Sequence, residues 1–396
     1  MEPTMEKDIV QKPIRPAWYK LVLRQDTITP AVLEHRYEGE GTDNNPHIVT
    51  FFKGDPRDPQ QFTGWDRWGL CLTTGFVTLG VTFGSSAFSS VISQTTQEFG
   101  GTTELGILGV SLFVIGFILG PFVWAPTSEL VGRQYIFIIS NFCHVAFNIG
   151  TCFAKDEATL LTLRFFSGAF GAAPLTNAGG VIADCFPASE RGLALTVFSV
   201  VPLLGPVLGP IVGGFVAESV GWRWVMGIIT ILTGSGAIVC TLALPETYVP
   251  VLLRRRAARL SKDTGKVYIS AMDMNSGSGG LNTSTLTKLT RPLLLLVFEP
   301  IIFCLSLYQS VVFGTLYLSF ASFPIVYGGA HHWSQGISGL PFLGLLVGAV
   351  IAVFYILPPE ARLPTCMVGG IAVPVGLFWF AWTNGPEIQQ YLQHRH

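Results

Sequence analysis

The sequence predicts an all-α protein that crosses a membrane many times. Only 12% of its 396 residues are charged and 49% are hydrophobic, whereas soluble domains carry about 25% charged residues. Nine apolar runs follow a polar N-terminal stretch, and a spanning helix needs roughly 20 such residues. A net charge of −1 without a strongly basic segment gives no sign of a nucleic-acid partner.

The runs divide the chain into two unequal groups. Six precede a hydrophilic linker and three follow it. We therefore expect a cytosolic N-terminal tail (1–67), a six-helix bundle (68–245), a cytosolic linker (246–298) and a partial second bundle (299–396). The nine runs lie at about 68–92, 105–125, 135–154, 160–183, 193–217, 224–244, 299–325, 337–357 and 366–383.

Charge distribution predicts the orientation. With the N-terminus inside, 20 of the 24 Lys and Arg residues lie on the cytosolic side and 3 on the other, as the positive-inside rule requires. The tail contains Asp-Pro-Arg-Asp-Pro at 55–59, and a residue before proline avoids helical geometry. We therefore expect a mobile cytosolic tail. We also expect the protein to lie in the plasma membrane, with the vacuolar membrane as the alternative.

The fifth run contains the most unusual pattern, GPVLGPIVGG at 205–214. Its prolines and glycines each recur every fourth residue, so each set follows one helix face. Glycines let a neighbouring helix approach closely, and prolines remove backbone donors and bend a helix. The pattern predicts a bent helix that lines or gates a path, with a tightly packed structural helix as the alternative. The residues are Pro202, Gly205, Pro206, Gly209, Pro210, Gly213 and Gly214.

A single arginine lies inside the fourth run. Arg164 begins the pattern R-x-x-x-G-x-x-G with Gly168 and Gly171. An arginine at the bilayer centre costs about 3 kcal/mol on insertion scales, so it is a candidate functional residue. The alternative is that Arg164, close to the start of the run, extends towards the membrane surface.

The short connection after the second run reads APTSELVGRQ at 125–134. Gly132 permits a tight turn, and Glu129 and Arg133 can form a charge latch at the cytosolic rim. The alternative is a solvated turn whose charges contribute little. Glu246, in the string PETYVP after the sixth run, is expected to be a helix-end or latch residue.

These motifs resemble the drug:proton antiporter branch of the major facilitator superfamily, and within it the fungal multidrug and secondary-metabolite exporters. The match covers about residues 55–383, and Gln134 departs from it because relatives have a basic residue there. The resemblance implies the major facilitator fold and proton-coupled export of small, mostly apolar molecules by alternating access. It also implies a role for Arg164 in proton transfer, a monomer, and no cofactor beyond the proton gradient.

Candidate substrate contacts are polar or aromatic residues inside the runs. Span seven lines the cavity in the resembled family, so its three members are taken as a set, although each alone is more typical of helix packing. No acidic residue lies deep in any run, which leaves the proton acceptor unidentified. The candidates are Asn177 in the fourth run and Tyr308, Gln309 and Tyr317 in the seventh.

Three other functions compete with export. The family has twelve spans and this chain has nine runs, so a truncated, non-transporting membrane protein is one alternative. A polyamine transporter of the same superfamily is another, but its cavity needs acidic residues. A membrane-embedded enzyme requires a catalytic constellation, and none is visible. The scattered cysteines predict neither disulfides nor a metal site.

Overall fold

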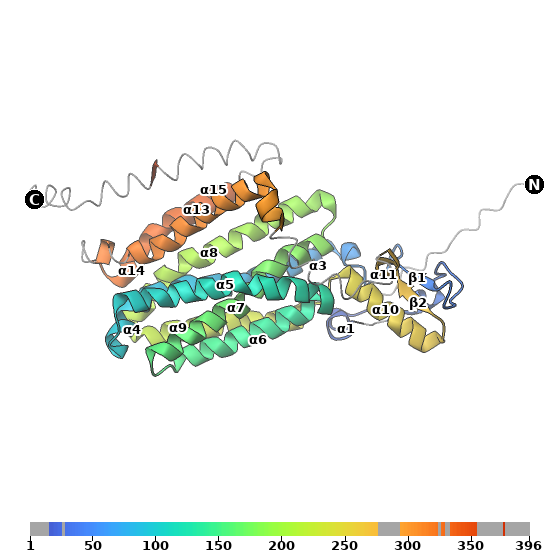
Figure 1. Cartoon of the computed structure of the whole chain (residues 1–396), viewed down its shortest axis with the longest axis horizontal. Coiled ribbons are helices and arrows are strands. Elements are labelled where there is room, and N and C mark those ends of the chain that lie inside the picture. Colours follow the sequence, from blue (N-terminus) through green and yellow to red (C-terminus); the bar gives the residue numbers. More distant parts are fainter. Residues whose placement is uncertain are drawn as a thin grey trace, which may run out of the picture.

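The structure is a computed structural model that describes residues 16–25, 28–275, 294–323, 326–328, 333–354 and 375–376. A long bundle of helices fills most of it, and a smaller unit of short helices and strands lies beyond one end (Figure 1). We call the side of the bundle that carries this small unit the cap end, and the opposite side the far end.

Seven of the described helices are long and apolar enough to cross a membrane. They correspond to the first seven apolar runs of the sequence. The first span is continued past its 3-10 segment, so it extends from Gly64 to Phe99. The elements are α3 (Gly64–Ala87) with η2 (Phe88–Val91) and α4 (Ile92–Phe99), α5 (Thr103–Val131), α6 (Arg133–Cys152), α7 (Glu157–Cys185), α8 (Ala188–Val220), α9 (Trp222–Ala243) and α13 (Pro300–Phe323).

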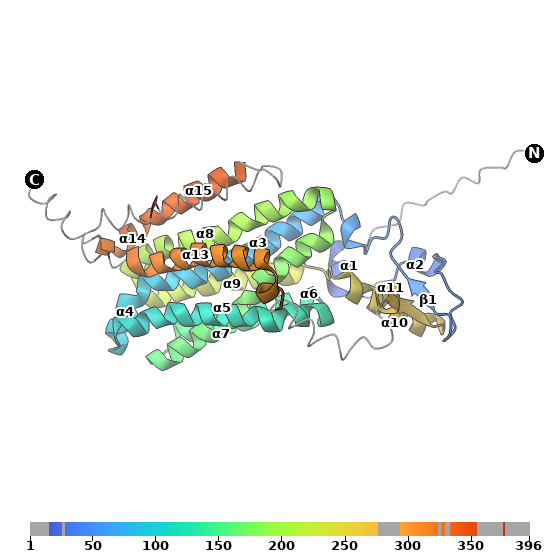
Figure 2. The same ribbon diagram turned by 45° about the horizontal axis from the view of Figure 1, so that its top comes forward.

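The eighth run is not one helix. It is divided into α14 (Gln335–Ser338), η4 (Leu340–Phe342) and α15 (Leu343–Phe354), with Pro341 inside the break, where its ring removes a backbone donor. Both α14 and α15 lie against α8 (Figure 1, Figure 2). The ninth run, 366–383, lies outside the described residues except for 375–376.

Local chemistry sets the helix boundaries. Thr63 and Asp66 form a capping box at the start of α3, each side chain accepting from the other's backbone N–H, which satisfies donors that a helix start leaves free. Between α5 and α6 only Gly132 intervenes, with φ at 111°. That left-handed geometry favours glycine, so the predicted tight turn at Gly132 is confirmed.

Close backbone packing holds α5 against α7. A Cβ atom on Gly116 would lie 2.8 Å from the backbone nitrogen of Ala169, and one on Gly168 would lie 2.9 Å from the carbonyl carbon of Phe113. Real Cβ atoms do not approach backbone so closely, and small residues are what allow membrane helices to pack at this distance. Gly116 of α5 and Gly168 of α7 therefore allow the two helices to pack backbone to backbone.

The N-terminal segment and the linker fold together into one unit, which we call the cap. Its two strands pair in parallel, with His47 opposite Tyr268. Val32, Val49 and Leu253 belong to its own hydrophobic core. The cap consists of α1 (Trp18–Leu23), α2 (Pro30–Glu34), β1 (His47–Val49), η1 (Pro59–Gln61), α10 (Val249–Thr264), β2 (Tyr268–Ser270) and α11 (Ala271–Asn275).

The prediction of a mobile N-terminal tail is therefore wrong for the described part of residues 16–67. The segment is held in place by a partner in the linker, about 200 residues further along the chain. Asp55 and Arg256 form an ion pair in which the two side chains are 0% and 4% exposed. The cap is tied to the bundle by the Trp18 indole, which donates to the Ala243 carbonyl at 3.0 Å.

We expect Asp55→Ala to destabilise the cap by about 3–5 kcal/mol, because it leaves the buried Arg256 without its carboxylate. Limited proteolysis of the detergent-purified chain should then cut within residues 16–62 much faster. Asp263→Ala is the matched control, since its pair with Arg259 is exposed and contributes at most about 1 kcal/mol. Equal proteolysis of the two variants would contradict the buried clasp.

Candidate functional site

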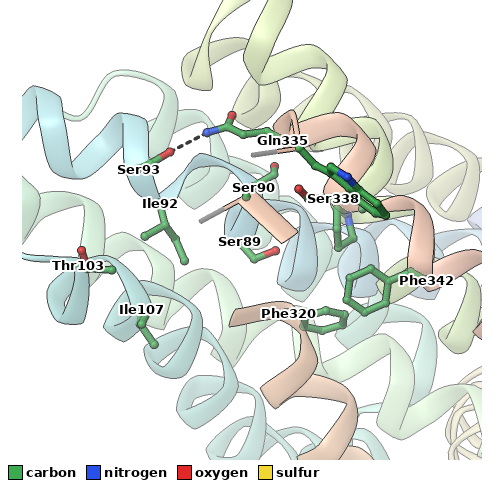
Figure 3. A pocket seen from close by; sticks show the side chains of 14 residues that line it. Ser89, Ser90, Ile92, Ser93, Thr103, Ile107, Phe320, Gln335, Ser338 and Phe342 are labelled. Carbon is green, nitrogen blue, oxygen red and sulfur yellow. Dashed lines mark hydrogen bonds between the residues drawn. The ribbon is translucent and has the colours of Figure 1, made fainter. Parts of the chain in front are cut away.

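A cavity of about 360 Å3 lies at the far end, between the six-helix bundle and the helices that follow the linker. Its walls combine hydroxyl groups such as Ser89 and Ser90 with the aromatic rings of Phe320 and Phe342 (Figure 3). None of its described lining residues is charged. Ligand pockets are mostly apolar with a few polar groups that fix orientation, so this cavity is suited to a small neutral molecule with an apolar body.

At the far end, contacts between α8 and α14 lie beside this cavity. A Cβ atom on Gly214 would lie 2.7 Å from the carbonyl oxygen of Gln335, so the two backbones touch there. The Glu218 carboxylate accepts the backbone N–H of Gly336 at 3.0 Å. From the other wall, Ser93 accepts the side-chain amide of Gln335 at 2.7 Å (Figure 3). We call these contacts the far-end closure.

The opposite face of α8 packs on α3 through its glycines. Cβ atoms on Gly205 and Gly209 would lie 2.6 and 2.8 Å from the backbone nitrogens of Phe83 and Ala87. Gly213 continues the same contact one turn later. The Ser86 hydroxyl adds a hydrogen bond to the Gly205 carbonyl at 3.3 Å. The predicted close approach along the glycine face is thus present.

The prolines of α8 do not end the helix. Pro202, Pro206 and Pro210 all lie inside the 33-residue element, although each removes a backbone donor. Pro206 and Pro210 are buried, and Pro210 also lines the cavity. Membrane helices tolerate such positions where neighbouring groups or a cavity satisfy the freed carbonyls. The gating role predicted for this helix remains a proposal.

Arg164 is completely buried, at 0% exposure, so it does not extend to the membrane surface. Its guanidinium donates to the carbonyls of Gly84 at 2.9 Å and Gly109 at 3.3 Å, and thereby joins α7 to α3 and α5. The rings of Phe88 and Phe113 lie 4.5 and 4.6 Å from its central carbon. Aromatic faces attract a cation most strongly when it is desolvated, so carbonyl dipoles and rings solvate this charge.

Arg164 is also connected to the helix after the linker. Its Nη2 donates to the Ser85 carbonyl at 3.4 Å, and the Ser85 hydroxyl lies 3.1 Å from the Tyr317 hydroxyl on α13. Ser85 and Tyr317 therefore connect the buried Arg164 to α13, where the six-helix bundle meets the helices that follow the linker.

At the cap end, Arg133 forms an ion pair with a residue that the sequence did not single out. Its Nε lies 2.6 Å from Asp184 at the end of α7, and its guanidinium lies over the Tyr248 ring. The signal for Asp184 was its place at the end of an apolar run, level with the APTSELVGRQ turn. Glu129, in the last turn of α5, shares this region, since its charge is among those that influence Tyr248.

Glu246 is the helix-end residue that the sequence predicted. Its side chain is 0% exposed and accepts the backbone N–H groups of Arg133 at 3.0 Å and Tyr248 at 2.9 Å. These contacts satisfy the free donors at the start of α6, where a negative charge is favoured. The first residues of the linker are thereby fixed to the bundle at the same place as the Arg133–Asp184 pair.

A second buried polar cluster joins α6 to α7. His144 Nδ1 donates to the Ser167 carbonyl at 2.7 Å, and its Nε2 accepts from the Asn148 side chain at 3.0 Å. The Ser167 hydroxyl completes the ring by donating to Asn148 at 3.0 Å. The histidine is thus a hydrogen-bonded core residue.

The four predicted substrate contacts are not brought together, and none lines the cavity described above. Asn177 is buried and donates to the Ala173 carbonyl of its own helix at 3.0 Å. Tyr308 and Gln309 are exposed, whereas Tyr317 contacts Ser85. The cavity hydroxyls were missed, although the Ser-rich segment 85–90 was a signal for them.

Comparisons with known proteins agree with this geometry. The family model of the Major Facilitator Superfamily matches residues 74–389. The multidrug transporter mdrA of Aspergillus fumigatus is 48% identical over 97% of this chain, and the efflux pump MFS2 of Trichophyton rubrum is 48% identical over 94%. The chain spans 66% and 65% of the length of these two relatives.

A solved structure supports the fold alone. The proton:xylose symporter XylE, bound to 6-bromo-6-deoxy-D-glucose, superposes with a TM-score of 0.57 at 16% identity. The superposition covers 74% of this chain and 70% of that one. The predicted all-α, multi-pass fold is therefore confirmed.

We expect Gly209→Val to disrupt the packing of α8 on α3, because even its Cβ atom would meet backbone. The cost should be about 2 kcal/mol or more, measured as a lower melting temperature in detergent. Gly192→Val in the same helix is the matched control, since nothing lies within 4 Å of a Cβ atom there. Similar melting temperatures for the two variants would contradict the glycine contact.

Proposed function

Because the chain belongs to the major facilitator superfamily, we propose that it is a secondary active transporter that exports small, mostly apolar molecules. Export would proceed by proton-coupled alternating access, in a monomer of the plasma membrane with the cap in the cytosol and no cofactor. The names of the two relatives, a multidrug transporter and an efflux pump, support this direction of transport.

The observation that carries the proposal is the uncharged cavity between the two halves, with the far-end closure above it. A substrate would enter from the cap end, occupy the space among Ser90, Phe320 and Phe342, and leave when the closure opens. Glycine contacts suit such a gate, because two backbones can separate without extracting interlocked side chains. This assigns the predicted gating role to the 205–214 segment of α8.

Arg164 is proposed to support the coupling to protons rather than to bind the substrate. It does not line the cavity, and its described partners are carbonyl oxygens and aromatic rings. A buried cation raises the local potential, which favours proton loss from any acidic group nearby. Through Ser85 and Tyr317 the same cation would influence how α13 packs.

The cytosolic latch is proposed to include Asp184 as the partner of Arg133, with Glu129, Gly132 and Glu246 completing the turn. Such a cluster would hold the cap end together in one state and release it in another. Polyamine transport is the second candidate, but the described cavity wall offers no carboxylate for a polycation. Neutral substrates are therefore favoured.

The central test is accumulation of fluorescent or toxic compounds in a yeast strain depleted of its own pumps. We expect the chain to lower accumulation, and an uncoupler to abolish the effect. Arg164→Ala should also abolish it, since the variant removes the cation that supports coupling. Surface expression of each variant is measured in parallel. Normal surface expression without any reduction in accumulation would favour the non-transporting alternative.

Filling the cavity tests the proposed substrate site directly. Ser90→Phe places a ring in the cavity wall and should reduce export at least about tenfold, if neutral molecules pass there. Ser199→Phe makes the same change on an exposed position of α8 and should leave export unchanged. Unaffected export by Ser90→Phe at normal surface expression would move the substrate path elsewhere.

A further inference from the structure

The cap contains a buried cation with two unused hydrogen-bond donors. Arg57 is 3% exposed and donates from Nη1 to the Leu21 carbonyl at 2.9 Å. Its other two nitrogens, Nε and Nη2, make no hydrogen bond among the described residues. Buried polar groups are normally hydrogen-bonded, so these two donors are free to bind an acceptor.

The carboxylates around Arg57 are used by other donors. Asp55 binds Arg256 through both of its oxygens, with Nη2 at 3.0 Å from Oδ1. The same Oδ1 also accepts the backbone N–H of Arg57 at 2.9 Å. The charges of Glu246 and Asp55 both act on Arg57, but no described carboxylate accepts a hydrogen bond from its Nε or Nη2. Burial lowers the pKa of Arg57 to about 10, so the group remains protonated at neutral pH.

A threonine hydroxyl lies in the wall of the same small cavity. Thr29, Arg57 and Arg256 line it together. The Thr29 hydroxyl is buried and makes no hydrogen bond, although the residue precedes α2 and makes no cap contact. Thr29 is followed by Pro30, and this is the one Ser/Thr-Pro pair in the sequence. The two unbonded donors of Arg57 and the unbonded Thr29 hydroxyl therefore line one cavity. The Thr-Pro sequence at this point is of the kind that proline-directed kinases modify.

We propose that Thr29 is a phosphorylation site whose phosphate is bound by Arg57. In the reaction, the Thr29 oxygen attacks the γ-phosphorus of a nucleoside triphosphate, the nucleoside diphosphate leaves, and the hydroxyl proton is released. The product carries about −1.5 to −2 charges and three acceptor oxygens. These oxygens match the free Nε and Nη2 of Arg57, since a guanidinium binds phosphate with two parallel hydrogen bonds.

Modification requires a local rearrangement of the cap. The cavity is too narrow for a water molecule, so the phosphorylated segment must move outward while its phosphate stays against Arg57. The rearrangement is confined to a short element, because α2 has only five residues, of which Pro30 is exposed and Val32 is buried in the cap core. A cap that is fixed to the end of α9 and to the start of α6 would carry this change to the bundle.

The first experiment asks whether the modification occurs. The full chain is purified in detergent, incubated with ATP and a proline-directed protein kinase, and analysed by phosphopeptide mass spectrometry. We expect phosphate on Thr29 and its loss in Thr29→Val. The cellular reaction rests on the proposed cytosolic location of the cap, but this reaction in solution does not depend on orientation or on transport. Absence of phosphate on Thr29 in the purified chain would overturn the proposal.

The second experiment tests the role of Arg57. Phosphorylation should raise the melting temperature of the chain by about 2 °C or more, and the rise should disappear in Arg57→Gln. The unmodified Arg57→Gln variant should still fold, because glutamine keeps a donor for the Leu21 carbonyl. An equal rise in both backgrounds would show that Arg57 does not bind the phosphate.

Two controls distinguish other sources of the anion. Inorganic phosphate added to unmodified protein tests a free anion. Asp26→Asn tests a carboxylate that is near Thr29 in the sequence. One contrary outcome is a melting temperature that changes on addition of phosphate or on loss of Asp26, only when Arg57 is present, and does not change on phosphorylation. Arg57 would then bind that other anion, and the proposal would be wrong.

Discussion

The contact of one helix with both halves of the molecule is the constraint on which the rest of the structure depends. The glycines of α8 at 205, 209 and 213 bring it onto the backbone of α3, and Gly214 brings it onto α14. Any side chain on these positions would separate the helices. Because prolines prevent some of its own hydrogen bonds, α8 relies on this packing more than an ordinary helix does. The same element therefore fixes the six-helix bundle and closes the cavity beside it.

The buried Arg164 also depends on close contacts between helices. The charge of Arg164 is stabilised by carbonyl oxygens of two other helices and by the faces of two aromatic rings, where other buried arginines have a carboxylate partner. This arrangement makes the charge part of the packing of α3, α5 and α7, so it need not face a water-filled path to persist. It also places the cation one residue away from the hydroxyl that contacts α13. Structural and coupling roles are thus compatible in one side chain.

How much the sequence could predict depended on the range of the interaction. The first seven spans were found because run length alone decides whether a helix can cross. The cap was missed because its clasp joins Asp55 to Arg256 across the whole six-helix bundle, and each segment looks polar by itself. Tyr308 and Tyr317 do not lie together for a simpler reason: nine residues at about 100° each place them on opposite faces of α13. The cavity hydroxyls come from a Ser-rich part of the first span, whose length and apolar character alone predict only a membrane helix.

At each end of the bundle a carboxylate accepts hydrogen bonds from backbone N–H groups. At the far end Glu218 accepts one N–H of α14, and it is exposed to solvent. At the cap end Glu246 accepts several N–H groups and is fully buried. A carboxylate buried among donors is expensive to release, whereas an exposed one exchanges its single donor for water at little cost. This difference favours the far end over the cap end as the side that opens more readily from this state.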